Sequence, residues 1–141
     1  MNHKSLAIFL FLTLNSHLIS QSDNRYDPFD WVQYRQLGEI TSITEGFAYL
    51  YVGTESGGVV RINRIGYNLD EPITSAQGLQ SNTISAVHFD RHTGNLWIVA
   101  GNYIHSSHTR EGNWNNSHID EWGLPLRTVI LRLGSSPNYV W

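Results

Sequence analysis

Residues Gly78–Trp97 read Gly-Leu-Gln-Ser-Asn-Thr-Ile-Ser-Ala-Val-His-Phe-Asp-Arg-His-Thr-Gly-Asn-Leu-Trp. This stretch holds a polar opening, a β-prone run from Ile84 to Phe89, and a turn rich in Asp, Gly and Asn before a second apolar run begins. Approximate copies lie on both sides, since Gly123 follows Gly78 by 45 residues and Trp141 follows Trp97 by 44. The spacing predicts a repeat protein.

Each unit is predicted to contain four strands. In the first, an aromatic run at Phe47–Gly53 and the apolar run Val59–Ile62 flank a glycine-rich turn, and a weaker last strand is expected at Pro72–Ser75. In the second, four strands are expected at Ile84–Phe89, Leu96–Ala100, Tyr103–Ser106 and Trp114–Ile119. Residues 40–62 and 84–119 should therefore form two successive antiparallel sheets, stacked face to face.

The second strand of the middle unit is apolar on both faces. Leu96 and Ile98 point one way, and Trp97 and Val99 the other, so this strand needs cover on both sides. Stacked β-propeller blades supply such cover, and four strands per 45 residues fits a blade. The predicted fold is all-β, a partial β-propeller of about two four-stranded blades plus the start of a third. The units are at about 37–77, 78–122 and 123–141, and a small antiparallel sandwich is the alternative.

The first 20 residues have the pattern of a secretory signal peptide. Lys4 precedes a nine-residue apolar run, Leu6–Leu14, and Ser20 supplies a small residue before cleavage. The run is far shorter than the roughly 20 residues needed to span a bilayer. We expect residues 1–20 to be removed, 21–30 to be a flexible lead, and 31–141 to form the incomplete propeller, exported to the periplasm or cell surface without a stable membrane span.

Composition narrows the possible partners. The chain is 40% apolar and 12% aromatic, which favours a folded domain over disorder. Beyond residue 20 it carries eight arginines against 12 acidic residues, a formal charge of −4, so a nucleic-acid partner is not expected. It has no cysteine, so stability must come from packing, and a lipid-anchored bacterial lipoprotein is excluded.

The candidate chemical groups do not form a recognisable site. Seven histidines raise the possibility of a metal, but the spacing of His105 and His108 puts them on opposite faces of a strand, and His88 and His92 straddle a strand end and its turn. The neighbouring carboxylates Asp120–Glu121 diverge on a strand, and Asn115–Ser117 matches only a short glycosylation pattern. No Ser, His and Asp set has a nucleophile-elbow context. We expect no catalytic, cofactor-binding or metal-binding residues, hence no enzyme.

The motifs resemble a known repeat. Gly78–Ile84, Phe89-Asp90 and Gly94–Ile98 are similar to the repeat of the two-component regulator propellers, roughly G-L-P-S-N, a strand, D, G and L-W-I-G-T. Leu50–Val59 matches the L-W-I-G-T part, with Tyr51 at the position where the family has Trp. The chain departs from the pattern at Val99-Ala100, where the family has Gly-Thr, and at Leu126-Arg127, where it has Ser-Asn. The resemblance covers roughly residues 37–141.

This resemblance implies an extracytoplasmic propeller of many blades. One branch of the family senses glycan fragments as part of hybrid histidine kinases. Another occurs in surface and secretion-associated proteins of bacteria with type IX secretion, often after an export signal and a Trp-x-x-Tyr segment such as Trp31 to Tyr34. We expect a non-catalytic module for ligand sensing or protein–protein interaction, with a protein or glycan ligand. A structural or secretion-machinery role at the cell surface is the alternative, and a propeller lyase or hydrolase is the third.

The sequence also stops within an expected strand, at Trp141. Two units and a part cannot close a ring of four to eight blades, and terminal repeats normally need capping. We therefore expect an N-terminal fragment of a larger sensor, whose remaining blades complete the ring. The alternative is that several short chains assemble one.

Overall fold

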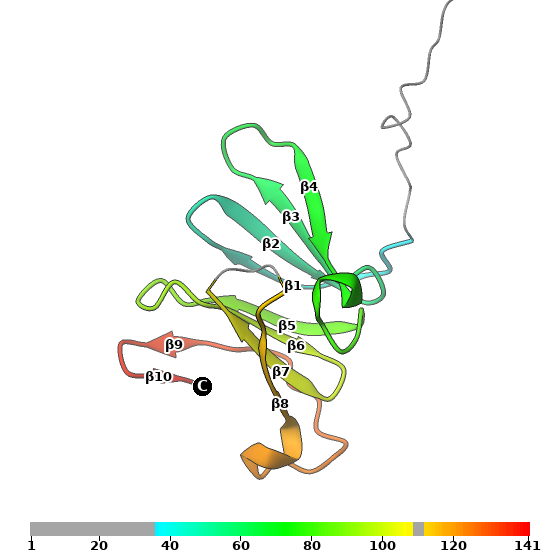
Figure 1. Cartoon of the computed structure of the whole chain (residues 1–141), viewed down its shortest axis with the longest axis vertical. Helices are drawn as coiled ribbons and strands as arrows, with labels where there is room; N and C mark the ends of the chain where they lie inside the picture. Colours follow the sequence, from blue (N-terminus) through cyan, green and yellow to red (C-terminus); the bar gives the residue numbers. More distant parts are fainter. Residues whose placement is uncertain (1–35, 109–111) are drawn as a thin grey trace, which may run out of the picture. The chain divides into compact units, whose positions relative to one another are not determined.

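Two four-stranded antiparallel sheets form most of the regular structure of the computed structural model, which describes residues 36–108 and 112–141 (Figure 1). Each sheet keeps its strands in sequence order. Sheet A contains β1 (Ile40–Glu45), β2 (Tyr49–Thr54), β3 (Val59–Asn63) and β4 (Leu69–Ile73). Sheet B contains β5 (Ile84–Phe89), β6 (Leu96–Ala100), β7 (Tyr103–Ser107) and β8 (Asn115–His118). The predicted pair of four-stranded antiparallel sheets is confirmed.

The expected last strand of sheet A needs a correction. It begins at Leu69, which pairs with Ile62, and not at Pro72, which lies inside it. A proline cannot donate to a strand ladder, so it is tolerated here because β4 is an edge strand. Because turn residues precede Leu69, the sequence pattern did not indicate that the strand begins there.

The third sheet is smaller than expected. It consists of β9 (Ser135–Ser136) and β10 (Tyr139–Val140), extended by two backbone hydrogen bonds between Gly134 and Trp141. The stretch 129–133, in which Val129, Leu131 and Leu133 alternate as in a strand, has no strand partner among the described residues. Its Ile130 and Leu133 side chains instead pack on sheet B as an irregular segment.

Two short 3-10 turns follow the sheets. They are η1 (Ser75–Gln77) and η2 (Ile119–Trp122), and each ends at a glycine in the left-handed region. These glycines, Gly78 at φ 102° and Gly123 at φ 74°, have a conformation that other residues rarely adopt. Both sheets are therefore followed by a short 3-10 turn that ends at a left-handed glycine.

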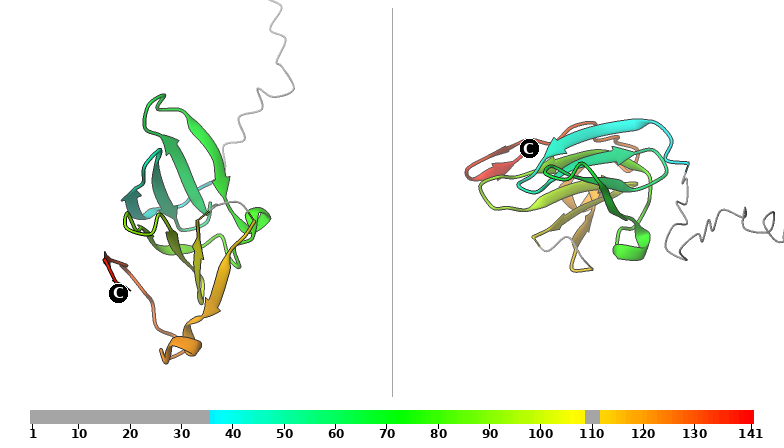
Figure 2. Two further views of the ribbon diagram at one scale, coloured as in Figure 1. Left: turned by 60° about the vertical axis from the view of Figure 1, so that its left-hand side comes forward. Right: turned by 90° about the horizontal axis from the view of Figure 1, so that it is seen from above.

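The first strands share one irregularity. The register between β1 and β2 shifts between Ile40 and Ser42, and the register between β5 and β6 shifts between Ile84 and Ala86. Such a bulge bends a strand and increases its twist. β1 and β5 are thus bent at matching positions, and they lie directly against each other (Figure 2).

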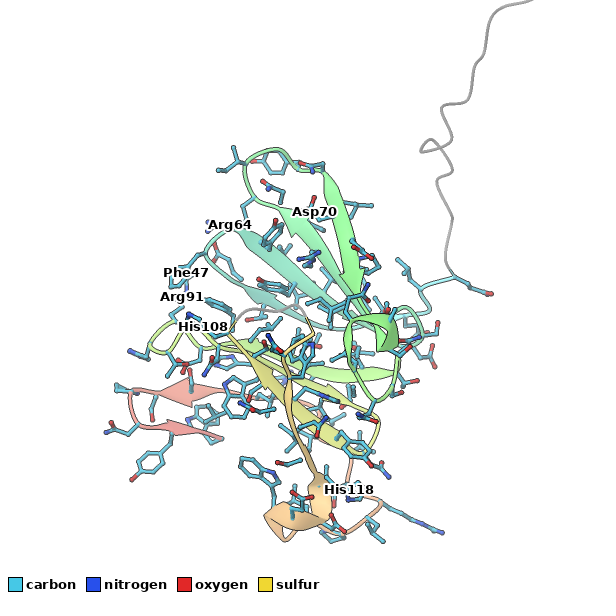
Figure 3. The ribbon with its side chains drawn as sticks, in the orientation of Figure 1. Phe47, Arg64, Asp70, Arg91, His108 and His118 are labelled. Carbon is cyan, nitrogen blue, oxygen red and sulfur yellow. The ribbon has the colours of Figure 1, made fainter. Side chains whose placement is uncertain are left out.

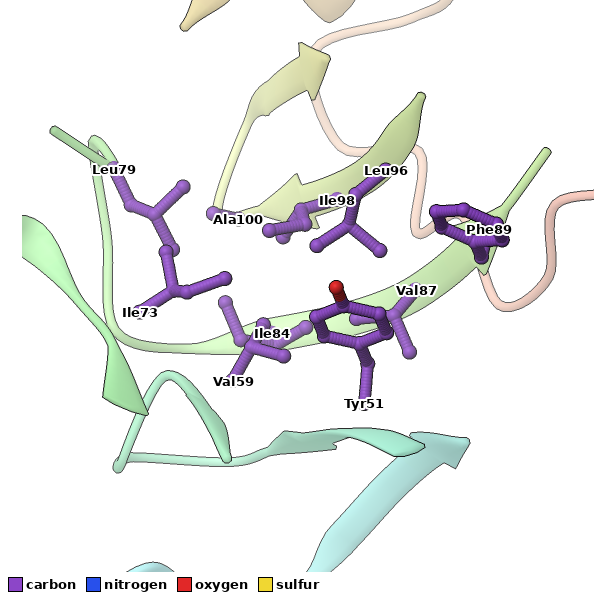
Figure 4. Packing of buried hydrophobic residues seen from close by; sticks show 10 residues of the cluster. All are labelled: Tyr51, Val59, Ile73, Leu79, Ile84, Val87, Phe89, Leu96, Ile98 and Ala100. Atoms are coloured by element: carbon purple, nitrogen blue, oxygen red, sulfur yellow. The ribbon is translucent and has the colours of Figure 1, made fainter. Parts of the chain in front are cut away.

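The main core lies between sheets A and B (Figure 4). In β6 every second residue enters it, as alternating side chains require, whereas in β5 the bulge brings Ile84 and Val87 into the same core. Its members are Tyr51, Val59, Ile73, Leu79, Ile84, Val87, Phe89, Leu96, Ile98 and Ala100. Burying each large apolar side chain stabilises the fold by roughly 1.5–3 kcal/mol, so this core holds the two sheets face to face.

A second core covers the other face of sheet B. It contains Ala86, Val99, Ile104 and Ile119, and the partly buried Trp97, Leu124, Ile130 and Leu133 pack against it. β6 therefore buries apolar side chains on both faces, as the sequence predicted.

Polar contacts also join the two sheets. The Phe89 backbone N–H donates to Thr44 Oγ1 at 3.0 Å, and Gly58 N–H donates to the Asn82 carbonyl at 2.9 Å. At one end, the Glu45 carboxylate lies 2.5 Å from Arg64 and 3.1 Å from Arg91, near Phe47 (Figure 3). These charges are about half exposed, so they contribute little to stability.

The expected signal peptide, lead and Trp31–Tyr34 segment lie outside the described residues. Within the described ranges, no helix has the length and apolar character to cross a membrane.

Candidate functional site

A groove of about 330 Å³ runs along the first strands. Its walls come from three segments, which are Thr41–Thr44 of β1, Ala86–His88 of β5 and Leu131–Leu133. Three polar residues, Thr44, His88 and Arg132, follow one another along the sequence at intervals of 44 residues. The groove thus combines a hydroxyl, an imidazole and a guanidinium with apolar neighbours, a mixture suited to binding a polar ligand.

A partly buried polar cluster lies at one end of these strands. His88 Nε2 is 2.9 Å from Ser135 Oγ, and the Ser135 hydroxyl donates to Asp90 Oδ1 at 3.1 Å. Asp90 also accepts from the His92 backbone N–H at 3.0 Å and from Thr93 Oγ1 at 2.6 Å. Asp90 is only 2% exposed, and these three hydrogen bonds satisfy its buried carboxylate.

The charges of this cluster follow from its contacts. The hydrogen bond from Thr93, reinforced by those from His92 and Ser135, lowers the pKa of Asp90 despite its burial. Burial lowers the pKa of His88, and the nearby Asp90 carboxylate only partly offsets this. At neutral pH Asp90 is therefore ionised and His88 is neutral.

The order of these contacts differs from that of a catalytic triad. In a triad the carboxylate orients the histidine, and the histidine accepts the serine proton. Here the Ser135 proton goes to Asp90, so His88 must donate from Nε2 to the serine oxygen. The arrangement fixes Ser135 to sheet B and leaves its oxygen without a base.

Two aromatic clefts lie between sheet B and the C-terminal segment. One, of about 360 Å³, is lined by Asp90, Thr93, Asn95, Trp97, Trp122, Ser136, Pro137, Asn138, Tyr139 and Val140. The other, of about 200 Å³, shares Trp97, Trp122 and Val140 with it and is largely apolar. The Trp97 indole is partly buried, and its buried Nε1 has no hydrogen-bond partner among the residues that the structure describes. Trp97 lies beside Leu124 and Ile130, so the face of β6 that carries Trp97 is covered by residues from beyond sheet B.

His105 is fully buried on β7. Its Nε2 accepts a long hydrogen bond, 3.4 Å, from the Gln80 backbone N–H, and its ring meets Trp114 edge to face. Burial lowers the pKa of His105 to about 4, so the ring is neutral at physiological pH. The neutral ring acts as part of the core.

The histidine pairs considered from the sequence do not meet at a common site. His108 is exposed (Figure 3), whereas His105 is buried, and His92 is exposed, whereas His88 is partly buried. Across residues 36–108 and 112–141, no group of three or more His, Cys, Asp or Glu side chains could hold a metal.

The remaining sequence candidates are at the surface. Asp120 and Glu121 belong to η2, where Asp120 contacts the His118 ring, and Asn115–Ser117 lies in the edge strand β8. Sequence reasoning missed the His88–Asp90–Ser135 cluster. The available signal was that Ser135 follows Asp90 by 45 residues and His88 by 47, which is close to the repeat spacing.

No protein-family model and no curated protein matches this chain.

Proposed function

We propose that this chain is a non-catalytic, exported β-propeller module that binds a ligand, with sheets A and B as successive blades. One observation carries the proposal. The bent first strands β1 and β5 lie against each other, and residues 131–133 join them in a single groove. In a propeller the blades surround a central channel, so this groove belongs to the channel wall.

The groove supports a binding role in preference to a catalytic one. Its polar groups are spaced along three separate segments, as expected for a surface that contacts an extended ligand. The His88, Asp90 and Ser135 cluster beside it has hydrogen bonds that hold Ser135 in place and do not activate it. The ligand that suits these groups is a glycan or a polar protein segment, recognised by hydrogen bonds from the groove.

Binding can be tested with the full-length protein on an array of oligosaccharides. We expect one class of oligosaccharide to bind, and Arg132→Ala, which removes the groove's cation, to weaken binding at least tenfold. Arg127→Ala is the matched control, since Arg127 is an exposed arginine outside the groove residues. Binding that is unaffected by Arg132→Ala would contradict this site. Failure to bind any glycan, with co-purification of a cell-surface complex, would favour the structural role.

Export is a separate part of the proposal. Cell fractionation followed by N-terminal sequencing should find the mature protein outside the cytoplasm, starting near Gln21. Uncleaved protein in the cytoplasmic fraction would contradict it.

A further inference from the structure

The segment that joins the two sheets is held onto sheet B by polar contacts. We call residues 74–83, which lie between β4 and β5 and include η1, the connecting segment. The Gln77 carbonyl in this segment accepts from the Trp114 indole Nε1 at 2.8 Å. Three residues further on, the Gln80 backbone N–H donates to His105 Nε2 of β7 at 3.4 Å. The connecting segment thus depends on two ring nitrogens of sheet B and its border for its place.

The contact with Gln80 determines which nitrogen of His105 carries the proton. A backbone N–H can only donate, so Nε2 accepts with its lone pair and the proton of the neutral ring is on Nδ1. Nδ1 is buried and has no hydrogen-bond partner among the residues that the structure describes. Buried donors without a partner are rare in folded proteins and require an explanation.

Protonation of the ring would turn the contact with Gln80 into a repulsion. A protonated histidine has an N–H at both nitrogens, so its Nε2–H would face the Gln80 N–H. The ring is fully buried, and the described residues that contact it or lie opposite it in the sheet supply no carboxylate. They are Gln80, Ile98, Tyr103, Trp114 and Asn116. A charged ring is therefore accommodated only after the contact with Gln80 is broken and water reaches it.

The direction of the pH effect follows from this burial. Burial lowers the pKa of His105 to about 4 while the connecting segment is in place, against about 6.5 for a histidine in water. Since the held form binds the proton more weakly than a released form, acid favours release. Between pH 6.5 and pH 4 the ratio of released to held molecules should rise by up to roughly 300-fold, as these two pKa values require.

We propose that His105 is an acid-sensitive latch, whose protonation releases the connecting segment from sheet B while the strands of both sheets stay paired. The contact of Gln80 is lost first, followed by that of its neighbour Gln77. The strand ladders persist because backbone groups make them, and the His105 ring takes no part in them. Leu79 of the connecting segment belongs to the core between the sheets, so release loosens the joint between sheets A and B.

Amide hydrogen exchange of the full-length protein, followed by NMR between pH 7 and 4.5, tests the latch. We expect the protection factor of the Gln80 amide to fall at least tenfold over this range. The amides of β6, which pairs with a strand on each side, should keep theirs. At pH 7 the ring nitrogen shifts of His105 should place the proton on Nδ1. A proton on Nε2, or a parallel loss of protection in β6, would overturn the proposal.

His105→Gln separates the latch from other effects of acid. The glutamine Oε1 can replace Nε2 as the acceptor for the Gln80 N–H but does not titrate, so protection of Gln80 should no longer depend on pH. His108→Gln makes the same exchange at an exposed position, and Gln80 should still respond to acid in it. An undiminished response in His105→Gln would overturn the proposal. If that variant is unfolded by circular dichroism, the ring tautomer and the comparison of Gln80 with β6 in the wild type decide the matter.

Discussion

His88 Nε2 and Ser135 Oγ lie 2.9 Å apart, although 47 residues separate them in the sequence. The contact joins the first strand of sheet B to the first residue of β9. Its counterpart one unit earlier is the hydrogen bond from the Phe89 N–H to Thr44 Oγ1, across 45 residues. Each unit is thus tied to the next by a polar contact from the same position, because Thr44 and His88 are 44 residues apart.

Ser135→Ala should lower the free energy of unfolding by about 1–2 kcal/mol, since Asp90 loses a donor and His88 an acceptor. Ser136→Ala is the matched control, because the Ser136 hydroxyl makes only a 3.5 Å contact with the Tyr139 carbonyl. Urea unfolding of both variants measures the difference. Equal stability of the two would show that the cluster does not hold the C-terminal segment.

The protein should lose stability as the pH falls from about 6.5 toward 4. The pKa of His105 is about 4 in the folded protein and near 6.5 when unfolded, so protonation favours the unfolded chain in this window. The loss attributable to His105 is at most roughly 3 kcal/mol. His88, whose pKa is also lowered, acts in the same direction. Thermal melts at several pH values measure the slope.

The matched variants for this pH dependence are His105→Phe and His108→Gln. The first removes the buried titrating group and should flatten the slope, although His88 keeps part of it. The second replaces an exposed histidine and controls for the loss of an imidazole at the surface. An undiminished slope in His105→Phe would assign the effect to other groups.

Trp97→Ala should destabilise the fold by about 3 kcal/mol, because it opens a cavity beside Leu124 and Ile130. Trp122→Ala, at a site that is 53% exposed, should cost much less. Denaturant unfolding distinguishes the two. If Trp97→Ala unfolds like the parent but no longer binds ligand, Trp97 is a recognition residue and its packing role is wrong.

Gly58→Ala should be more damaging than Gly112→Ala, although both glycines have φ near +70°. A Cβ on Gly58 would lie 2.3 Å from the Ile73 carbonyl oxygen, whereas one on Gly112 would meet nothing within 4 Å. The shared backbone strain is about 1–2 kcal/mol, and the clash adds roughly 1–3 kcal/mol at Gly58 alone. Similar melting temperatures for the two variants would contradict the close contact between the β2–β3 turn and β4.

The sequence predicted the sheets well where local pattern determines structure. β6 is apolar at every position, and both of its faces are indeed covered. The start of β4 was missed because Leu69 follows turn residues and Pro72 interrupts the pattern. The stretch 129–133 has the alternation of a strand, but alternation cannot show whether a partner strand is present.

The cluster at the candidate site could not be predicted in the same way. His88, Asp90 and Ser135 come together only through the packing of one unit on the next, which local periodicity does not report. His105 occupies a strand position that suits an apolar residue, and its burial depends on Trp114 and Gln80. Only the repeat spacing links such positions in advance.

The central claim is that sheets A and B stack face to face as successive units. A nuclear Overhauser spectrum of isotopically labelled full-length protein tests it most directly. We predict cross-peaks between the rings of Phe47 and Phe89, whose centres are 5.0 Å apart, and between Tyr51 and Phe89. Their absence, together with cross-peaks that pair β4 with β5 as neighbouring strands of one continuous sheet, would contradict the stacked arrangement and the propeller proposed from it.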